Sequence, residues 1–409
     1  MGEGAARAKP SVVLLAPIAP ATTGNGLAMR AGMLVTALAP AADVHVVVVP
    51  VSGSTADHAW VTARASSVAV VEPATGSAAR DHTTRQLADP ELRTRLERTS
   101  PLPSRALLAP PTLAATVAAA LPRGLGSVGA VLAMRLYLAP LGVQLARELS
   151  AGRIVVDADD DDAALLLALG NEEEADAYER LARCWLQVAD AVLAASAADA
   201  EGVAHRARLD ASRVHVVPNA IDVPAHPPPR PGDDRLLFLG NLSYEPNRLA
   251  ARALAETVLP RIRAHRPTAT LELVGPLTAG ALDDLDRVPG VRVVGAVPDV
   301  APWYARADVV VVPLRHGAGT RIKVLEAFAH RRPVVATSVG VAGLDVEAGR
   351  EVVIAESPDE LARAVCEVLD DPVRGDALVE HAARLVDARY RPEVVAPLVR
   401  AAVLGGPVQ

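Results

Sequence analysis

Short runs of valine and leucine recur along this chain, and most are followed by a glycine turn and a stretch of helical composition. The first run, SVVLLAP, covers residues 11–17, and DVHVVVVP follows a helical stretch at 43–50. The same alternation returns with RLLFLG at 235–240 and DVVVVPL at 308–314. Runs this apolar are typical of strands buried on both faces, as in parallel sheets covered by helices. The pattern predicts an α/β protein built from doubly wound parallel sheets.

A proline-rich segment, PAHPPPRPGDD, interrupts this alternation. Its five prolines exclude a helix and a central strand, so we interpret it as a linker. A chain of 409 residues is long enough for two domains of ordinary size. We therefore predict two Rossmann-like domains that face each other across a cleft, with ligands at the carboxyl ends of the strands. The predicted parts are a first domain at 1–223, the linker at 224–234, a second domain at 235–390, and a C-terminal helix within 391–409 that packs back on the first domain.

The composition restricts the class of partner. A net charge of −7 lacks the basic field that nonspecific nucleic-acid binding needs, so no nucleic-acid partner is expected. The two cysteines, Cys184 and Cys366, indicate neither a disulfide framework nor a zinc site, which favours the cytoplasm. The N-terminus shows no signal peptide, and the uncharged residues 106–122 are too rich in alanine and proline for a membrane span. We expect a cytoplasmic protein without a transmembrane segment, for which peripheral contact with a membrane stays open.

One lysine stands out because the chain has almost none. Of 41 lysine and arginine residues, only Lys9 and Lys323 are lysines. Lys323 follows a predicted strand and a glycine loop, and it lies with Arg321 in the first turn of the next predicted helix. Such a loop binds anions through backbone N–H groups and the helix dipole, whereas a cation there is otherwise mildly unfavourable. Because Glu326 lies on the same helix face, the pattern predicts a phosphate and sugar site; an exposed Lys–Glu pair on a surface helix is the alternative.

This segment resembles the donor-binding motif of family 4 glycosyltransferases, which have the GT-B fold of two facing Rossmann-like domains. IKVLEAFA matches the pattern K-x-L-E-A-x-A, and RRPVVATS matches the small-residue stretch that follows it. FLGNLSYEPNRLAARAL resembles the start of the C-terminal domain in the branch that reads G-x-(L/M)-x-x-x-P-N, and VVPNAID resembles V-P-N-G-V-D at the end of the N-terminal domain. The resemblance covers residues 157–370, and also 11–50 by the glycine loop and helix, whereas 51–135 match nothing we can name.

The resemblance implies roles for individual residues. Glu326 would hold the nucleotide ribose, and the loop Gly24–Gly26 would lie close to the donor diphosphate. Many members have a second acid eight residues before the glutamate that contacts the sugar; here that residue is Ala318, so recognition of the sugar must differ. The predicted donor-binding residues are Gly24, Asn25, Gly26, Asn241, Arg248, His316, Gly317, Gly319, Thr320, Arg321, Lys323 and Glu326.

The expected charge at the diphosphate also departs from the family pattern. Many members carry an Arg/Lys pair near the start of the C-terminal domain, where this chain has only Arg248. We therefore expect Arg321 and Lys323 to neutralise the leaving diphosphate and, with Glu326, to stabilise the donor during catalysis. The resemblance implies transfer without a metal, so no metal or cofactor is expected beyond the nucleotide sugar as co-substrate.

An acidic run, DADDDD at residues 157–162, follows a predicted strand. Negative charge is favourable at the start of a helix, and this structural interpretation comes first. A contact of Asp159 with the acceptor comes second, and a hard metal ion third. Arg135 follows another predicted strand, so Arg135 and Asp159 are further catalytic candidates. The arginine-bearing stretch 80–105 around His82 is interpreted as a solvated helix face, with an acceptor site as the alternative.

The resemblance implies a retaining glycosyltransferase that moves a sugar from a nucleotide-diphosphate sugar to a hydroxyl of a small molecule or a lipid-linked saccharide. The apolar stretch between Leu107 and Met134 suggests an apolar acceptor. The alternatives are a GT-B nucleotide-sugar epimerase and a non-catalytic protein that binds sugar nucleotides, as the missing acid at Ala318 would suggest. A nicotinamide oxidoreductase is disfavoured because the N-terminal loop lacks G-x-G-x-x-G.

Overall fold

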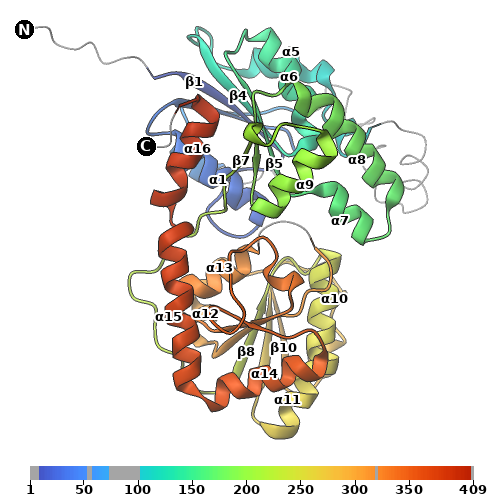
Figure 1. The fold of residues 1–409 in the computed structure, drawn as a ribbon, viewed down its shortest axis with the longest axis vertical. Coiled ribbons are helices and arrows are strands. Elements are labelled where there is room, and N and C mark those ends of the chain that lie inside the picture. The colour runs from blue at the N-terminus through green and yellow to red at the C-terminus, as the bar shows by residue number, and fades with distance from the viewer. Residues whose placement is uncertain (1–8, 53–57, 73–101, 318–320, 407–409) are drawn as a thin grey trace, which may run out of the picture. The chain divides into compact units, whose positions relative to one another are not determined.

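The chain forms two compact units (Figure 1). The first unit contains Met1–Val217 and Val395–Gln409, and the second contains Pro218–Val394. The chain thus enters the second unit before the proline-rich segment 224–234 and returns to the first unit inside its last helix. The residues that the computed structural model describes are 9–52, 58–72, 102–317 and 321–406.

A seven-stranded parallel sheet forms the centre of the first unit, in the order β3-β2-β1-β4-β5-β6-β7. The order reverses between β1 and β4, and doubly wound sheets bind ligands outside the carboxyl ends of the strands at such a point. The side chains of β1 are buried on both faces because helices cover the sheet, which explains its unbroken apolar sequence. The strands are β1 (Ser11–Ala16), β2 (Asp43–Val48), β3 (Ser67–Val70), β4 (Val128–Met134), β5 (Ile154–Asp159), β6 (Ala191–Ala194) and β7 (Val214–Val216).

The α-helices described in the first unit follow the strands in alternation. The last of them, α16, begins at Pro392 and ends at Leu404, so it starts in the second unit and ends in the first. They are α1 (Gly26–Leu38), α2 (Ala59–Thr62), α5 (Ala114–Ala120), α6 (Ala139–Glu148), α7 (Asp162–Ala168), α8 (Glu172–Trp185), α9 (Ala197–Ala207) and α16 (Pro392–Leu404).

The apolar stretch at 106–122 folds into two short 3₁₀ turns and helix α5, all belonging to the first unit. Three of its larger side chains, Leu113, Val117 and Leu121, belong to the hydrophobic core of this unit, whereas Leu107 and Leu108 are half-buried. Packing inside the first unit therefore explains part of the apolar composition. The stretch around His82 lies outside the described residues, except for 102–105.

A six-stranded parallel sheet forms the centre of the second unit, in the order β10-β9-β8-β11-β12-β13. Here the order reverses between β8 and β11. The prediction of two doubly wound, Rossmann-like α/β domains is thereby confirmed. The strands are β8 (Arg235–Leu239), β9 (Thr270–Val274), β10 (Val291–Gly295), β11 (Val309–Val312), β12 (Val334–Ala336) and β13 (Val353–Ile354), and the α-helices are α10 (Glu245–Ala253), α11 (Leu259–His265), α12 (Ala301–Arg306), α13 (Ile322–Ala329), α14 (Pro358–Asp370) and α15 (Pro372–Arg389).

Two prolines shape the first helical segment of the second unit. Pro246 lies in the first turn of α10, where its missing N–H costs no helical hydrogen bond. At Pro260 the sequence predicts a kink or a break. The structure instead has a π-helical stretch, Leu254–Val258, between α10 and α11, so Pro260 falls in the first turn of α11. The wider turn accommodates the proline without interrupting the helical path.

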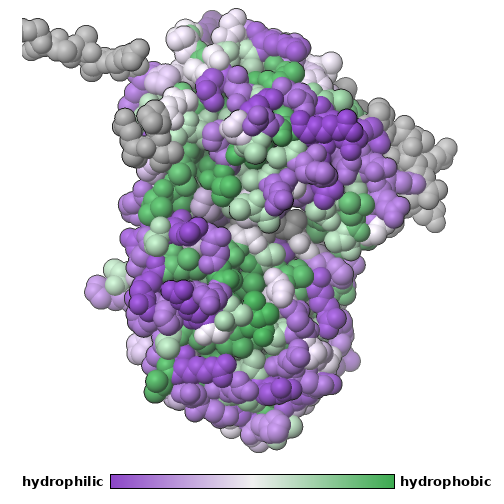
Figure 2. Space-filling model, in the orientation of Figure 1, coloured by the Kyte–Doolittle hydropathy of each residue, from purple (hydrophilic) through white to green (hydrophobic). Residues whose placement is uncertain are grey.

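On the face that Figure 2 shows, hydrophilic and apolar side chains are mixed over the first unit, whereas apolar residues gather over the middle of the second unit and hydrophilic ones lie toward its edges. The exposed large apolar side chains come from separate elements, for example Leu167 of α7, Leu249 of α10 and Val373 of α15. Scattered residues of this kind are normal for a protein surface. Among the described residues, no helix is both long enough and apolar enough to cross a membrane.

Candidate functional site

The predicted anion site lies in the second unit, where β11 leads into α13. The backbone of Gly317 has a φ of +148°, and a Cβ atom there would lie 2.8 Å from Nη2 of Arg321. Only glycine therefore allows the arginine to approach this closely. Arg321 is the N-cap residue of α13, is buried, and donates from Nε to the carbonyl oxygen of Val339 at 3.0 Å. His316 is exposed beside it. Gly319 and Thr320, with Ala318, lie outside the described residues.

Lys323 lies in the first turn of α13. Its ammonium group points toward the carboxyl end of β8 and the first turn of α10. Nζ donates to Oδ1 of Asn247 at 2.6 Å and lies 4.7 Å from the centre of the Phe238 ring. Burial, together with the positive charge of Arg321, lowers the pKa of Lys323 from 10.5 to about 7, although Glu326 opposes the shift. A polyanion bound here would restore the positive charge.

Space for this ammonium group depends on two glycines at the carboxyl ends of neighbouring strands. A Cβ atom on Gly240, directly after β8, would lie 2.7 Å from Nζ of Lys323. A Cβ atom on Gly275, directly after β9, would lie 1.8 Å from the carbonyl oxygen of Gly240, and its φ is +139°. These glycines let two backbone segments and a lysine side chain share one small volume.

Glu326 lies one helical turn after Lys323 and is buried. The hydroxyl group of Tyr304, from α12, donates to its Oε2 at 2.9 Å. Tyr304 is fully buried and stacks on His330 at 4.8 Å between ring centres. Burial raises the pKa of Glu326 from 4.5 to about 7, while the hydrogen bond from Tyr304 and the charge of Lys323 pull it down. Tyr304 thus holds the carboxylate of Glu326 through Oε2.

Together these groups can bind a diphosphate and a diol. Arg321 and Lys323 supply positive charge at the start of α13, where the helix dipole also favours an anion. Glu326 can accept hydrogen bonds from hydroxyl groups one turn farther along. The sequence prediction named these residues, and the structure brings them together at one helix end.

The other two donor residues predicted in the second unit lie at the start of α10. Asn241 accepts on Oδ1 from the backbone N–H of Ser243 at 3.0 Å, and its carbonyl oxygen accepts from Asn247 at 2.9 Å. Arg248 is paired with Glu245 at 3.7 Å and is partly exposed. Asn241 therefore supports the site through its backbone, and Arg248 makes no described contact with Lys323 or Arg321.

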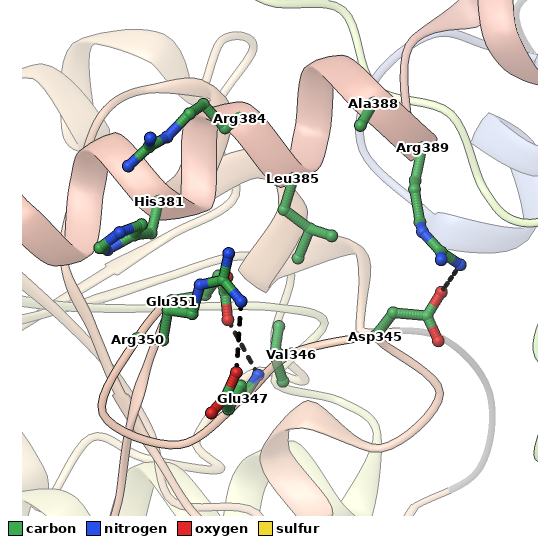
Figure 3. Close-up of a pocket in the computed structure, with 10 residues that line it drawn as sticks. All are labelled: Asp345, Val346, Glu347, Arg350, Glu351, His381, Arg384, Leu385, Ala388 and Arg389. Atoms are coloured by element: carbon green, nitrogen blue, oxygen red, sulfur yellow. Dashed lines mark hydrogen bonds and ion pairs between the residues drawn. The ribbon is translucent and has the colours of Figure 1, made fainter.

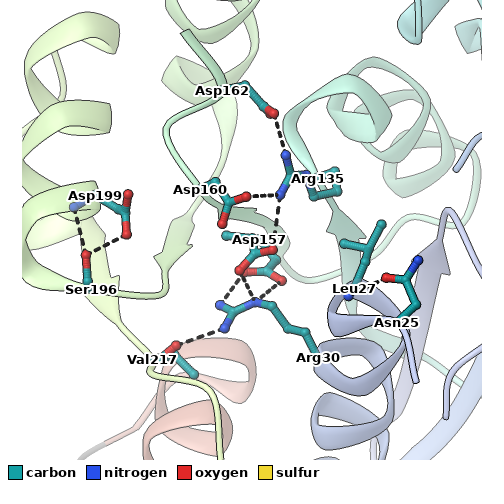
Figure 4. A network of polar contacts seen from close by, with 11 residues as sticks. Asn25, Leu27, Arg30, Arg135, Asp157, Asp160, Asp162, Ser196, Asp199 and Val217 are labelled. Atoms are coloured by element: carbon teal, nitrogen blue, oxygen red, sulfur yellow. Dashed lines mark hydrogen bonds and ion pairs between the residues drawn. The ribbon is translucent and has the colours of Figure 1, made fainter. Parts of the chain in front are cut away.

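The glycine loop of the first unit connects β1 to α1. Gly24 has a φ of +93°, and Gly26 is the first residue of α1. Asn25 is the N-cap: its Oδ1 accepts from the backbone N–H of Leu27 at 2.8 Å (Figure 4). These residues give the loop a capped helix start at the carboxyl end of β1.

Arg135 and Asp159 belong to a buried ionic network in the first unit. Figure 4 shows Arg135 of this network with Asp160 and Asp162. Arg135 pairs with Asp159 at 3.1 Å, with Asp160 at 2.9 Å, and also with Asp162. Both Arg135 and Asp159 have positive φ values, of 73° and 60°, which are unfavourable for these residues. Such outliers concentrate at sites where the surroundings impose the backbone geometry.

A second arginine, which no sequence motif singles out, completes this network. Arg30 of α1 is almost fully buried and pairs with Asp157 at 2.7 Å and with Asp159 at 3.1 Å. Its Nη1 donates to the carbonyl oxygen of Val217 at 3.1 Å. Asp161 caps α7 by accepting from the N–H of Ala164 at 3.0 Å, so the helix-start interpretation is confirmed there. Arginines compensate the acidic run, and the described residues contain no group arranged to hold a metal ion.

A pocket of about 400 Å³ lies elsewhere in the second unit, between α15 and the segment that precedes β13 (Figure 3). Its charged side chains neutralise one another: Arg389 pairs with Asp345 at 2.6 Å, and Arg350 pairs with Glu347 at 3.3 Å. This internal pairing does not favour a polyanion, so the pocket does not compete with the start of α13 as the donor site.

Sequence analysis missed three residues of the candidate site: Asn247, Tyr304 and Gly240. Asn247 is the asparagine of the P-N pair noted in the sequence, so its motif was visible but its contact with Lys323 was not. No sequence signal connects Tyr304 to Glu326.

Comparisons with known proteins cover the part of the chain that contains α13. Residues 233–371 match the family model described as Glycosyl transferases group 1. Over 93 residues the chain is 40% identical to D-inositol 3-phosphate glycosyltransferase of Thermobispora bispora, a match that covers 21% of this chain and 22% of that protein. Over 132 residues it is 31% identical to the lipopolysaccharide core biosynthesis mannosyltransferase LpcC of Rhizobium leguminosarum bv. viciae, covering 32% and 36%. Each match spans less than half the length of its curated relative.

The whole chain also resembles solved structures. HepE of Anabaena, solved in complex with UDP and glucose, superposes with a TM-score of 0.64 over 94% of this chain and 96% of HepE, at 16% sequence identity. A likeness at this identity concerns the fold. The chain therefore has the two-domain GT-B fold, and its second unit is similar to the group 1 glycosyltransferases over residues 233–371.

Proposed function

We propose that this protein is a retaining glycosyltransferase of family 4 that transfers a sugar from a nucleotide-diphosphate sugar to an acceptor hydroxyl. One observation carries the proposal: Arg321 and Lys323 lie at the start of α13, and the buried carboxylate of Glu326 lies one turn farther on. All three lie inside the segment that matches the glycosyltransferase family model.

The chemistry follows from where charge develops. As the bond between the sugar and the diphosphate breaks, negative charge grows on the leaving phosphate oxygen. Arg321, Lys323 and the helix N-terminus stabilise that charge more strongly in the transition state than in the bound donor. Glu326 accepts hydrogen bonds from the ribose hydroxyls and so positions the donor. These groups supply the charge without a metal ion, and we propose metal-independent transfer.

The donor and acceptor classes rest on the comparisons and on the described packing. HepE was solved with UDP-glucose as well as with UDP, so a uridine diphosphate sugar is the first donor to test. The stretch at 106–122 gives an apolar acceptor little support, because Leu113, Val117 and Leu121 are buried in the core and only Leu107 and Leu108 are half-buried. The names of the curated relatives favour a polyol or a saccharide, and an acceptor panel contains both classes together with lipid-linked saccharides.

The first experiment measures thermal stability against UDP-, GDP-, dTDP- and ADP-sugars. We expect one nucleotide to raise the melting temperature of the wild type, because a ligand that binds only the folded state stabilises it. Lys323→Ala and Glu326→Ala should lose that increase. Lys9→Ala is the matched control, since Lys9 is the exposed second lysine and should respond like the wild type. If no nucleotide sugar stabilises the wild type, the proposal is wrong.

A turnover assay separates this enzyme from a binding protein with the same fold. Release of the nucleoside diphosphate in the presence of an acceptor panel is expected for a transferase. Binding without release or transfer would support the non-catalytic alternative. For an identified product, the proton NMR coupling at the anomeric carbon tests retention of configuration.

We propose the cytoplasm as the compartment, because Cys184 and Cys366 are both free thiols.

A further inference from the structure

The side chain of Asn247 has a fixed orientation in the site. Its Nδ2 donates to the carbonyl oxygen of Asn241 at 2.9 Å, and its Oδ1 accepts from Nζ of Lys323 at 2.6 Å. A carbonyl oxygen cannot donate a hydrogen bond, so the nitrogen end of the amide must face Asn241 and the oxygen end must face the lysine. Asn247 is buried in the first turn of α10, so it has little freedom to change this arrangement.

The helix dipole and Lys323 would both favour an aspartate at this position, although an aspartate would lose the hydrogen bond that Nδ2 donates to Asn241. Negative charge in the first turn of a helix is stabilised by the helix dipole, and a carboxylate would pair with the ammonium group of Lys323. The chain has asparagine instead, which has nearly the same shape and no charge. The amide therefore orients the ammonium group through one hydrogen bond and leaves its positive charge uncompensated.

The remaining neighbours of Lys323 compensate that charge only in part. The Phe238 ring, 4.7 Å away, contributes a cation–π contact from β8 and no charge. Tyr304 of α12 donates to the backbone carbonyl oxygen of Lys323, at 3.2 Å, and to Oε2 of Glu326. The charged groups that act on Lys323 are Arg321, which repels it, and Glu326, which attracts it. The position thus has two cations and one carboxylate.

We propose that Asn247 is a positioning residue that orients Lys323 toward the donor diphosphate and keeps the charge of its ammonium group available for the leaving group. This inference rests on the proposed function. It also explains how one lysine replaces the Arg/Lys pair expected at the start of the second unit: the P-N pair of α10 supplies the anchor, and α13 supplies the cation.

The first test measures the titration of Lys323 directly and needs no ligand. Because the chain has only two lysines, lysine labelled with carbon-13 gives two side-chain signals, and exposed Lys9 serves as the internal reference. In Asn247→Asp, the new carboxylate should raise the pKa of Lys323 from about 7 by about 1 to 3, whereas Asn247→Ala should change it far less. An Asn247→Asp protein that titrates like the wild type would contradict the contact.

The second test measures the affinity for UDP-glucose by calorimetry at pH 7. Asn247→Asp should weaken binding at least about tenfold, because its carboxylate neutralises Lys323 and repels the diphosphate. Asn247→Ala loses only the orientation, so we expect a loss of about threefold. Asn171→Asp is the matched control: it makes the same change at the start of α8 in the first unit, where Asn171 is the N-cap, and binding should be unchanged.

The outcomes separate this inference from the proposed function. If the wild type binds and Asn247→Asp binds equally well, the role of Asn247 is wrong and the transferase proposal stands. Equal losses in the aspartate and alanine variants would also overturn it, because the charge would then have no effect. If no sugar nucleotide of the panel binds the wild type, the proposed function fails, and the inference fails with it.

Discussion

At the scale of a single residue, burial raises the pKa of Glu326, and the hydrogen bond from Tyr304 opposes that rise. In Tyr304→Phe, Oε2 of Glu326 loses the hydrogen bond that lowers its pKa, so its pKa should rise above about 7. An ionised carboxylate accepts ribose hydroxyls best, so the KM for the nucleotide sugar should increase about tenfold at pH 7, the effect of roughly one lost hydrogen bond to a charged group. The pH at which KM begins to rise on the acidic side should also increase.

KM and kcat measured between pH 6 and 9 check this prediction. A purely structural role for Tyr304 would lower the melting temperature and leave the acidic limb of the pH profile in place, and that result would contradict the assignment. Tyr390→Phe, at another buried tyrosine of the second unit, is the matched control and should leave the limb unchanged.

Under the proposed function, donor binding should depend on pH through Lys323. Its pKa is lowered to about 7, so at pH 8 the free site is mostly neutral, and binding of a diphosphate should be accompanied by uptake of a proton. A nucleotide sugar lacks a terminal phosphate that titrates in this range, so the proton is taken up by the protein. Calorimetry at pH 8 in two buffers with different ionisation enthalpies measures the uptake. Lys323→Arg stays protonated and should abolish it, and equal uptake in that variant would contradict the assignment.

The lowered pKa of Lys323 also makes the free energy of unfolding depend on pH. Between pH 7 and 10.5 the unfolded chain keeps a proton on this lysine that the folded chain releases, so the unfolded state binds more protons in this window. The contribution of Lys323 to the free energy of unfolding should therefore increase as the pH rises through it, and its cost is fully present below pH 7. Comparing the wild type with Lys323→Met across this range isolates the contribution.

At the scale of elements, Arg30 connects α1 to β5 and to Val217, the last residue of the first unit before the chain enters the second. Arg30→Met leaves the buried carboxylate of Asp157 without its cation, so the free energy of unfolding should fall by about 3 to 5 kcal/mol. Arg252→Ala, which breaks an exposed pair with Asp284, should cost less than about 1 kcal/mol. Urea unfolding followed by circular dichroism compares the two. Equal losses in the free energy of unfolding would mean that the buried pair of Arg30 and Asp157 stabilises the protein no more than the exposed pair does.

The sequence predicts elements better than it predicts contacts between them. Valine runs identify the strands, because strands buried on both faces have no polar periodicity. Lys323 and Glu326 can be placed on one face because they belong to one helix. Asn247 reaches Lys323 across 76 positions, and Tyr304 reaches Glu326 across 22. Such contacts depend on strand order in the sheet, which local composition does not encode. The π-helical stretch before Pro260 was missed for a different reason: a proline rule predicts a broken hydrogen bond, not how the backbone accommodates it.

At the scale of the whole molecule, α16 returns the chain to the first unit. Within that unit, Arg400 donates to the carbonyl oxygen of Ala37 at 3.1 Å, and Val399 and Val403 are fully buried. Deleting residues 395–409 exposes this surface, and the loss of two buried valines alone should cost about 3 to 6 kcal/mol. Thermal unfolding of the truncated chain measures this loss of stability. Deleting only 407–409 is the control, and an unchanged melting temperature after the larger deletion would contradict the role of α16.

The two ends of the second unit are joined by a hydrogen bond, since the backbone N–H of Ile221 donates to the carbonyl oxygen of Tyr390 at 2.8 Å. The unit is thus an insertion between Val217 and Val395 of the first. A gene can gain, lose or exchange such an insertion at two nearby splice points without cutting either hydrophobic core. Under the proposed function, recombination at these points would join a new donor-binding unit to the existing first unit, and chimaeras with a relative's insertion would then use a different nucleotide sugar.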